Sequence, residues 1–423
     1  MNLTIEPGFA SGAVTAPPSK SQAHRVLICS ALSGRPCTVE NMAWSEDLLA
    51  TLDCLTALGA RVEKQIGRRQ NAVTIDGAGI FTASEPAVLP CRASGSTLRF
   101  LIPVVLALGR PATFTGEESL FSRPLDYYER ICRMQDLVWE KGAEFLRVDG
   151  QLEADRFEIP GDVSSQFLTG MLLALPLLDG QSELCILPPV TSRPYIELTQ
   201  AVIRDFGIRA ISIGSDRFHI PANQSFRPHR TSLEGDWSNA AVWLAMNMLG
   251  SRITVKALAD RTVQGDKICQ TWFAAMGRQK LTADVTDHPD LAPLLMACAA
   301  ALHGAVLTGC GRLQYKESPR GEAMAEELRK FGADVLVDDD RIWVGSKPLR
   351  RPRENLNAHN DHRIAMALSV LCTVYGGTIE GAEAVRKSYP EFYDRLRSLG
   401  VEIKAEETPA LPAGEEAQHE SGL

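Results

Sequence analysis

A theme that recurs six times along the chain constrains the fold more than any other feature of the sequence. Each occurrence is an amphipathic helical pattern, then a glycine, then a short strand-like run, as in Leu58-Gly59-Ala60-Arg61-Val62. Glycine is the expected left-handed residue just past a helix end. The six glycines are Gly59, Gly142, Gly207, Gly277, Gly332 and Gly400. This repetition predicts an α/β protein built from six similar units.

A second helical theme alternates with the first and is apolar on nearly every side. Because a helix that is hydrophobic all round has to be buried, we expect these helices inside a shell of sheets. The alternative is an ordinary doubly wound sheet, in which the strands are the buried element. The six apolar helix bodies are residues 23–32, 98–108, 167–178, 240–249, 291–302 and 364–375.

The composition excludes several classes of protein. With 44 basic and 52 acidic residues the net charge is −8, which argues against a general electrostatic grip on nucleic acid. The most apolar stretches, such as residues 100–108, are too short to span a membrane, and no signal peptide is visible. The ten cysteines show neither a C-x-x-C pair nor zinc spacing, so we expect a reduced, cytoplasmic protein.

Each apolar helix opens with an unusual polar segment. The start of a helix presents unpaired N–H groups and about half a positive charge, which favours anion binding. One such start is usually an ordinary N-cap, but six of them, several with basic residues close behind, suggest a shared anion site in one cleft. The segments are residues 19–25, 94–99, 164–166, 236–239, 287–290 and 360–363.

Arg25, Arg99 and Arg363 lie on helices that otherwise look buried. A buried charge needs a partner, which is either a structural salt bridge or a bound anion. Further basic segments precede other predicted helices. For each of them, the alternative to an anion site is a solvated charged turn. They are residues 121–124, 192–195, 316–320 and 386–390. No phosphate-binding loop and no dinucleotide fingerprint is present, so we expect no nucleotide and no obligatory metal or other cofactor.

Taken in order, these segments resemble the family of 3-phosphoshikimate 1-carboxyvinyltransferases, also called 5-enolpyruvylshikimate-3-phosphate synthases. The similarity covers the whole chain except the tail. It implies a two-domain inside-out α/β barrel of six βαβαββ-like repeats, three per domain, with two crossings between the domains. We therefore expect one domain at residues 19–232, with Pro17-Pro18 and residues 226–232 as linkers, and a second domain of residues 1–18 plus 233–405. The acidic tail, residues 406–423, is predicted to be disordered.

The resemblance implies transfer of the enolpyruvyl (carboxyvinyl) group of phosphoenolpyruvate to the 5-hydroxyl of shikimate 3-phosphate. Phosphate is released by addition and elimination, in a step of the shikimate pathway. The partners would then be these small anionic substrates, with no nucleic acid and no membrane, and we expect a monomer. Two alternatives remain at this point: a UDP-N-acetylglucosamine enolpyruvyl transferase, and a binding paralogue without catalysis. The former family carries a cysteine in the loop corresponding to residues 115–124, where this chain has none.

The resemblance also implies roles for individual residues. Asp290 is expected to accept the hydroxyl proton, and Glu317 with Lys20 to move the proton at carbon. Shikimate 3-phosphate would be held by Lys20, Ser21, Arg25, Ser164, Ser165, Gln166, Ser192, Asp290 and Lys316. Phosphoenolpyruvate would be held by Lys20, Gly95, Arg123, Gln166, Arg320, Arg363 and Lys387. The chain departs from common family patterns at Ala93, Arg312, Gln314 and Pro319.

Overall fold

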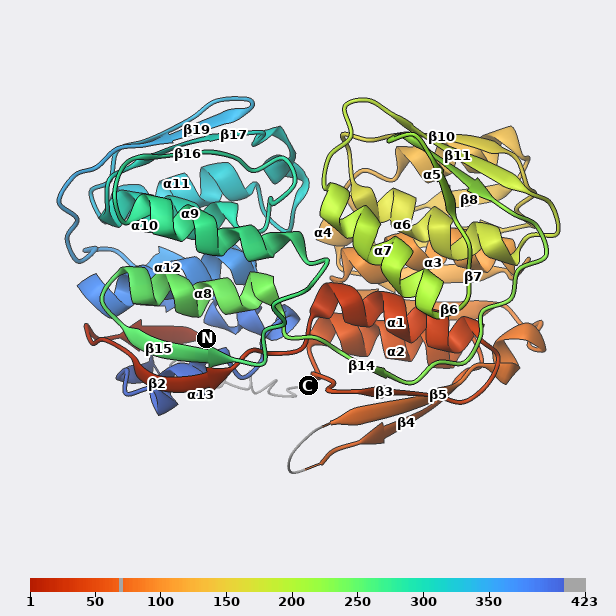
Figure 1. Ribbon diagram of the computed structural model, residues 1–423, viewed down its shortest axis with the longest axis horizontal. Coiled ribbons are helices and arrows are strands. Elements are labelled where there is room, and N and C mark those ends of the chain that lie inside the picture. The colour runs from red at the N-terminus through yellow and green to blue at the C-terminus, as the bar shows by residue number, and fades with distance from the viewer. Residues whose placement is uncertain (68–70, 407–423) are drawn as a thin grey trace, which may run out of the picture.

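The computed structural model describes residues 1–67 and 71–406 and arranges them in two lobes of similar build (Figure 1). Each lobe has its own apolar core. The core of the first lobe runs from Ala23 to Leu233, and that of the second combines Leu3 to Val14 with Trp237 to Val401. Residues 407–423, which hold nearly all of the predicted tail, lie outside the described part of the chain.

The first lobe holds the elements between the two crossings of the chain. Its helices are α1 (Lys20–Leu32), α2 (Glu46–Ala57), α3 (Gly95–Ala107), α4 (Glu118–Phe121), α5 (Asp126–Met134), α6 (Ser165–Ala174) and α7 (Arg193–Asp205). Its strands are β3 (Cys37–Glu40), β4 (Arg61–Gln65), β5 (Ala72–Asp76), β6 (Ala87–Arg92), β7 (Ala112–Gly116), β8 (Val138–Lys141), β9 (Phe145–Asp149), β10 (Arg156–Pro160), β11 (Ser182–Leu187), β12 (Ile211–Ile213), β13 (Arg217–Ile220) and β14 (Thr231–Ser232).

The second lobe joins the start of the chain to its second half. Its helices are α8 (Trp237–Met248), α9 (Cys269–Met276), α10 (Ala292–Ala301), α11 (Arg320–Lys330), α12 (His362–Tyr375) and α13 (Phe392–Ser398). Its strands are β1 (Asn2–Ile5), β2 (Ser11–Thr15), β15 (Arg252–Lys256), β16 (Leu281–Asp284), β17 (Ala305–Thr308), β18 (Val335–Val337), β19 (Arg341–Val344), β20 (Leu356–Asn357), β21 (Gly377–Glu380) and β22 (Ile403–Glu406).

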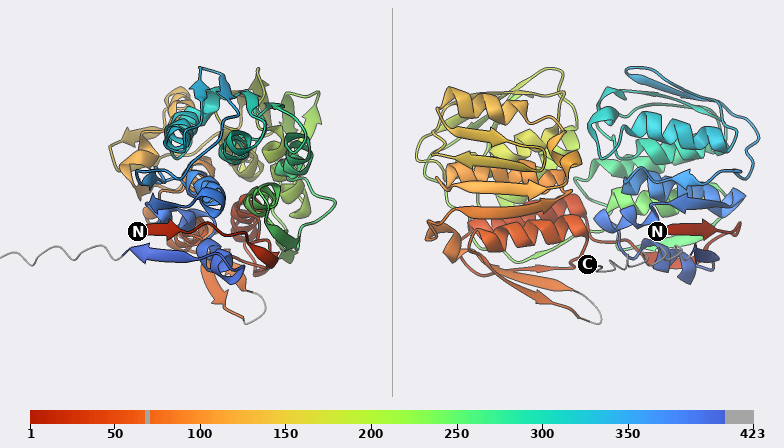
Figure 2. Two further views of the ribbon diagram at one scale, coloured as in Figure 1. Left: turned by 90° about the vertical axis from the view of Figure 1, so that its left-hand side faces the viewer. Right: turned by 180° about the vertical axis from the view of Figure 1, so that it is seen from behind.

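The buried elements are helices, as the sequence predicts. In α3, every residue except Ser96 is buried, and in α10 every residue except Ala301 is buried. The strands instead alternate: Leu89 of β6 is buried while its neighbour Val88 is exposed. One face of each sheet therefore points to solvent and the other covers the helices, an arrangement visible from three sides (Figures 1 and 2). The doubly wound alternative is wrong, and the inside-out α/β architecture is confirmed.

The sheets repeat one topology. In the order β6-β7-β9-β8, the first two strands are parallel and the others are antiparallel. The orders β10-β11-β13-β12 and β16-β17-β19-β18 have the same form. In each case the parallel strands are joined through a buried helix, as α3 joins β6 to β7. Parallel neighbours need such a crossover, which explains why every repeat carries an apolar helix between its first two strands.

The first strands of two repeats are exchanged between the lobes. Strand β2 precedes α1 in sequence but pairs with β15 of the second lobe, and β14 precedes α8 but pairs with β3 of the first lobe. The two crossing segments also bind each other: Ser19 N–H donates to the carbonyl of Glu234 at 2.8 Å, and Asp236 N–H to the carbonyl of Pro17 at 2.7 Å. The lobes are thus joined by two hydrogen-bonded segments.

Parts of the repeat prediction are wrong. Gly142 lies in the turn between β8 and β9, and helix α5 is instead followed by Asp136 with a φ of 54°. Gly277 is a C-cap in the right-handed helical region. The candidate linker at residues 226–232 packs against the first lobe, since Phe226 is buried in the first core and Thr231 begins β14.

Two further expectations can be compared with the structure. All ten cysteines are buried and none forms a disulfide. Among the described residues, no helix has both the length and the apolar character that crossing a membrane requires.

Candidate active site

A cavity of about 930 Å³, its open mouth included, lies between the lobes. The first lobe contributes the beginnings of α1, α3 and α6, and the second contributes segments before α10 and α11 together with the start of α12. The predicted site residues that line it are Lys20, Ser21, Arg25, Gly95, Arg123, Ser164, Ser165, Gln166, Ser192, Asp290, Lys316 and Glu317. Polar helix starts from both lobes therefore meet in one cleft.

Several of these helix starts are ordinary N-caps as well as cleft residues. The hydroxyl of Ser94 accepts from the N–H of Thr97, and that of Ser164 accepts from the N–H of Gln166 at 3.2 Å. Ser164 also lines the cleft. The cap and the site are thus compatible interpretations of the same residue.

Gly95 stands where two cations approach the beginning of α3. A Cβ atom at this position would lie 3.0 Å from a terminal nitrogen of Arg99 and 3.1 Å from one of Arg123. Arg99 in turn donates to Oε1 of Gln166 at 2.8 Å. A side chain at position 95 would displace these guanidinium groups, so the glycine keeps a small, positively charged corner open.

Arg25 is buried among neutral acceptors. It donates to the Thr199 hydroxyl at 2.8 Å, to the Thr169 hydroxyl at 3.0 Å and to the carbonyls of Ser21 and Tyr195. Burial lowers its pKa to about 10. Within the described ranges no carboxylate forms an ion pair with Arg25. The salt-bridge interpretation is therefore wrong for Arg25, whose charge remains available to an anion in the cleft.

Arg99 follows the same pattern. Its second terminal nitrogen donates to the carbonyl of Pro124 at 3.1 Å. Burial, together with the charge of Arg123, lowers the pKa of Arg99 to about 10. No ion pair with a carboxylate is formed by Arg99 in the part of the chain that the structure describes. The first-lobe wall thus carries buried cations that are not neutralised by direct carboxylate contact.

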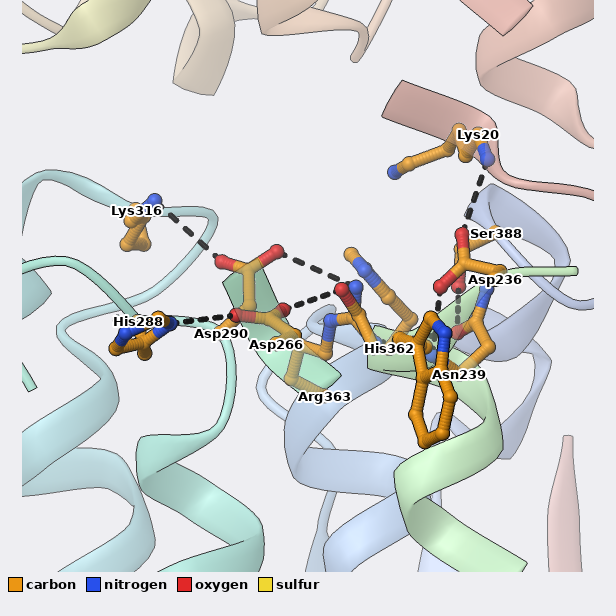
Figure 3. A network of polar contacts seen from close by, with 12 residues as sticks. Lys20, Asp236, Asn239, Asp266, His288, Asp290, Lys316, His362, Arg363 and Ser388 are labelled. Carbon is orange, nitrogen blue, oxygen red and sulfur yellow. Dashed lines mark hydrogen bonds and ion pairs between the residues drawn. The ribbon is translucent and has the colours of Figure 1, made fainter. Parts of the chain in front are cut away.

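The second-lobe wall pairs its cations with acids. Arg320, almost fully buried, contacts Asp290 at 2.7 Å, Glu317 at 2.6 Å and Asp361 at 2.8 Å. Asp290 also binds Arg363 at 3.2 Å and Lys316 at 3.4 Å, as Figure 3 shows. For Arg363 the salt-bridge interpretation holds, but its partner is a carboxylate of the cleft itself.

These contacts set the protonation of both carboxylates. Burial by itself would raise the pKa of Asp290, but Lys316, Arg320 and Arg363 hold it well below its usual range. In the same way Arg320 and Arg123 outweigh burial and hold the pKa of Glu317 well below its usual range. Both side chains are therefore ionised at neutral pH.

Three predicted residues do not border the cavity. Arg320 and Arg363 lie behind its wall and reach it through Asp290. Lys387 is buried, and its ammonium group donates to the carbonyl of Asn360 at 2.8 Å, next to the start of α12. The structure brings all three near the cleft without making them part of its surface.

The sequence-based assignment missed other cleft residues. Asp47 lines the cavity and binds the Lys20 ammonium at 2.7 Å, but an acid in the first turn of a helix is so common that nothing marked it. His362 was part of a noted motif without a role. Burial, with the charges of Lys20 and Arg363, holds its pKa well below the usual value, so its ring is neutral at pH 7.

Away from the cleft, Glu326, Glu327 and His359 come close enough together to hold a cation. Glu327 is already engaged by Lys330 at 2.9 Å and by the N–H of Asn357 at 2.9 Å. Its pKa stays below the usual value despite burial, because His359, Asn357 and Lys330 donate to it. The cluster is thus accounted for by internal contacts.

Comparisons with known proteins find relatives that match nearly the whole chain. The family model described as EPSP synthase (3-phosphoshikimate 1-carboxyvinyltransferase) matches residues 6–396. A 3-phosphoshikimate 1-carboxyvinyltransferase from Clostridium kluyveri is 39% identical over 428 residues, which covers 95% of this chain and 98% of the relative. One from Clostridium beijerinckii is 35% identical, with coverage of 94% and 97%. The solved EPSP synthase of Acinetobacter baumannii aligns with a TM-score of 0.76 at 23% identity, over 96% of this chain and 100% of that one.

Proposed function

Since the chain belongs to the EPSP synthase family, we propose that the cleft between its lobes is where its reaction takes place. The chain transfers the enolpyruvyl group of phosphoenolpyruvate to the 5-hydroxyl of shikimate 3-phosphate and releases phosphate. This is a step of the shikimate pathway. The family match favours this activity over a UDP-N-acetylglucosamine enolpyruvyl transferase and over a binding paralogue without catalysis.

The distribution of charge in the cleft is the observation that supports this location for the reaction. The two substrates together bring two phosphates and two carboxylates. Lys20, Arg25, Arg99, Arg123 and Lys316 face this cavity although the protein has a net charge of −8. Neither Arg25 nor Arg99 donates to a carboxylate in the described part of the chain. Preorganised cations in a site that partly excludes water interact strongly with anions, so the cleft suits these substrates.

We assign the two substrates to different sides of the cleft. Shikimate 3-phosphate binds beside the serine segments, where hydroxyl groups and a lysine can donate to its phosphate. This set is Lys20, Ser21, Arg25, Ser164, Ser165, Gln166, Ser192, Asp290 and Lys316. Phosphoenolpyruvate binds at the glycine corner and the second-lobe cations. That set is Lys20, Gly95, Arg123, Gln166, Arg320, Arg363 and Lys387.

In the addition step, the 5-hydroxyl oxygen bonds to C2 of phosphoenolpyruvate and its proton passes to Asp290. This carboxylate is a weak base while Lys316, Arg320 and Arg363 all contact it. Substrate anions that draw on the same cations raise its pKa and so strengthen it as a base. The binding of substrate thereby prepares the proton acceptor.

C3 of phosphoenolpyruvate must gain a proton in the same addition. Glu317 is ionised and has no proton to give, so the Lys20 ammonium, one of the charges that act on Glu317, donates the proton to C3 and is left as a neutral amine. In the elimination Glu317 takes a proton back from the new methyl group while the bond from carbon to the phosphate oxygen breaks. Positioned acids and bases of this kind give rate factors of about 10²–10⁴.

The assay that tests this function follows phosphate release from phosphoenolpyruvate by the purified protein. We expect release with shikimate 3-phosphate present and none without it. Equal release with UDP-N-acetylglucosamine as the acceptor, or no release with either acceptor, would refute the proposed activity.

The location, the oligomeric state and the domain division belong to the same proposal. The protein acts as a cytoplasmic monomer, with residues 19–232 as one domain and residues 1–18 plus 233–405 as the other. The separate apolar cores of the two lobes support this division. Sedimentation equilibrium at micromolar concentration should give a single species of about 46.1 kDa.

A further inference from the structure

The segment that carries Asp290 consists of two consecutive turns that meet at His288. The N–H of His288 donates to the carbonyl of Val285 at 2.9 Å, and its carbonyl accepts from the N–H of Leu291 at 3.1 Å. The second of these bonds closes a four-residue turn in which Pro289 and Asp290 are the central residues. A rotation of His288 would therefore move the backbone of Asp290.

Proline makes this turn stiff. Its ring fixes φ at about −65°, and it also restricts the backbone of the residue before it. Here these two positions are Pro289 and His288, so few dihedral angles remain free between the His288 ring and the Asp290 carboxylate. On the other side of the turn, Leu291 is buried in the second core. The place of Asp290 thus depends on how the His288 side chain is held.

The His288 ring is held by a different part of the second lobe. Its Nδ1 lies 3.3 Å from Oδ1 of Asp266, in the 3₁₀ turn η3 (Gly265–Ile268), and Figure 3 shows this contact. Because a carboxylate only accepts, the Nδ1–H group is the donor. The ring also meets Trp272 edge-on, with centroids 5.3 Å apart. A Cβ atom on Gly265 would lie 3.0 Å from Cε1 of the ring, so the glycine leaves room for it.

Asp266 is itself held by the beginning of helix α8. It is buried, and its other oxygen accepts from the Ser238 hydroxyl. Gln264, directly before η3, donates to the carbonyl of Gly235 at 2.9 Å. These bonds fix η3 relative to α8, so Asp266 offers His288 an acceptor at a defined place.

We propose that Asp266 and His288 are positioning residues that set the place of Asp290 in the cleft. The inference rests on the proposed function, in which Asp290 accepts the proton of the 5-hydroxyl. The cations of the cleft wall bind the Asp290 carboxylate, whereas the turn places its backbone. Neither Asp266 nor His288 lines the cavity, so they act on the reaction through the turn. A displacement of about 1 Å can cost a reaction roughly 100-fold in rate.

Two substitutions of His288 separate its hydrogen bond from its ring. His288→Phe keeps a ring against Trp272 but removes the donor, while His288→Asn keeps an N–H group near the position of Nδ1. We expect His288→Phe to lower kcat by about 10- to 100-fold and to leave KM for shikimate 3-phosphate within about twofold. His288→Asn should keep kcat within about threefold of the wild type. The control is His303→Phe, a change at an exposed histidine.

The same hydrogen bond can be removed from its other side. Asp266→Leu takes away the acceptor, while Asp266→Asn keeps an oxygen for the donor of His288. Since the two residues act through one bond, the double variant Asp266→Leu, His288→Phe should have the kcat of the more impaired single variant. Losses that multiply in the double variant would contradict the pair. Asp179→Leu, a change at an exposed aspartate, is the control, and urea denaturation verifies that each variant is folded.

Hydrogen exchange of residues 285–291 without substrates gives a readout that does not depend on activity. We expect faster exchange of the Leu291 N–H in His288→Phe and wild-type exchange in His288→Asn. Wild-type kcat in His288→Phe, an equal loss of kcat in His288→Asn, or unchanged exchange in His288→Phe would overturn the positioning role. If the wild type released no phosphate in the assay, the proposed function would fall, while exchange would still decide whether the pair holds the turn.

Discussion

Asp290 contacts Lys316, Arg320 and Arg363 at the same time. This position gives it two functions with opposing requirements. It neutralises cations that the substrates need, and it is the proposed proton acceptor. An aspartate that only completed an ion-pair network would be replaceable by asparagine at modest cost to the rate. The two functions can therefore be separated by removing its charge while keeping its shape.

We predict that Asp290→Asn lowers kcat by at least about 100-fold, because proton transfer from the 5-hydroxyl loses its acceptor. KM for both substrates should stay equal or fall, because the three cations no longer share their charge with a carboxylate. Steady-state phosphate-release kinetics measure both quantities, with Asp179→Asn as the control. A variant that kept kcat within a few-fold would show that Asp290 is not the base.

His24 and His362 make stability depend on pH. His24 is fully buried, its Nδ1 lies 2.8 Å from the Thr51 hydroxyl, and burial, then Lys20 and Arg25, hold its pKa well below the usual value. In the unfolded chain this histidine has a pKa near 6.5 and becomes protonated below that pH, while in the folded protein its ring stays neutral. The free energy of unfolding therefore has its full value above about pH 6.5 and decreases as the pH falls below that value.

We predict that His24→Asn flattens this dependence. Each histidine that stays neutral in the fold contributes a slope of up to about 1.4 kcal/mol per pH unit. Between pH 6.5 and 5 the wild type should lose about 2 kcal/mol more unfolding free energy than the variant, as measured by urea denaturation. Parallel profiles for the two proteins would contradict the assignment.

At the scale of elements, the buried helices α3 and α6 pack closely against each other at Gly170. Gly170 of α6 faces α3, where a Cβ atom would lie 2.5 Å from the carbonyl oxygen of Arg99 and 3.0 Å from the ring of Pro103. The Tyr128 hydroxyl donates to that same carbonyl oxygen at 2.8 Å. The glycine thus sets the separation of two helices whose beginnings form the cleft.

We predict that Gly170→Ala lowers the unfolding free energy by about 1–3 kcal/mol, because the added methyl group overpacks this crossing. This runs against helix propensity, which favours alanine by about 1 kcal/mol. Urea denaturation measures the difference. Gly8→Ala is the control, since the nearest atom to a Cβ atom there is 4.0 Å away. Equal effects at both positions would rule out a close helix crossing.

The sequence predicted these helices well because an apolar helix needs no knowledge of its neighbours. It also predicted the meeting of their polar starts, because the same segment type recurs in every unit. Interaction partners that depend on the tertiary structure were harder to predict from the sequence. Arg25, for example, donates to hydroxyls and carbonyls, although a carboxylate was a reasonable expectation. The pairing of β2 with β15 joins distant segments, and no local pattern carries that information.

At the scale of the whole molecule, the two lobes differ in how much they depend on strands from a distant part of the chain. The second core includes Leu3 and Ile5 from β1 and Val14 from β2. Strand β1 lies between β21 and β22, so its removal splits a sheet in two. The first core takes nothing from residues before Ala23. The first lobe is therefore self-sufficient, while the second depends on a distant part of the chain.

We predict that a fragment of residues 19–232 folds cooperatively by itself, while residues 233–406 do not. Adding a peptide of residues 1–18 should restore folding of the second fragment, because β1 and β2 complete its sheets. Circular dichroism during urea titration measures cooperativity for each fragment. Cooperative unfolding of residues 233–406 without the peptide would contradict the proposed division into domains.

The same exchange has a consequence for the nascent chain on the ribosome. Strands β1 and β2 emerge early, but their neighbours β15, β21 and β22 are translated only after the entire first lobe. At about 5–20 residues per second, β2 waits roughly 10–50 s for β15. During that interval its backbone is unpaired and open to chaperones or to mispairing with other chains.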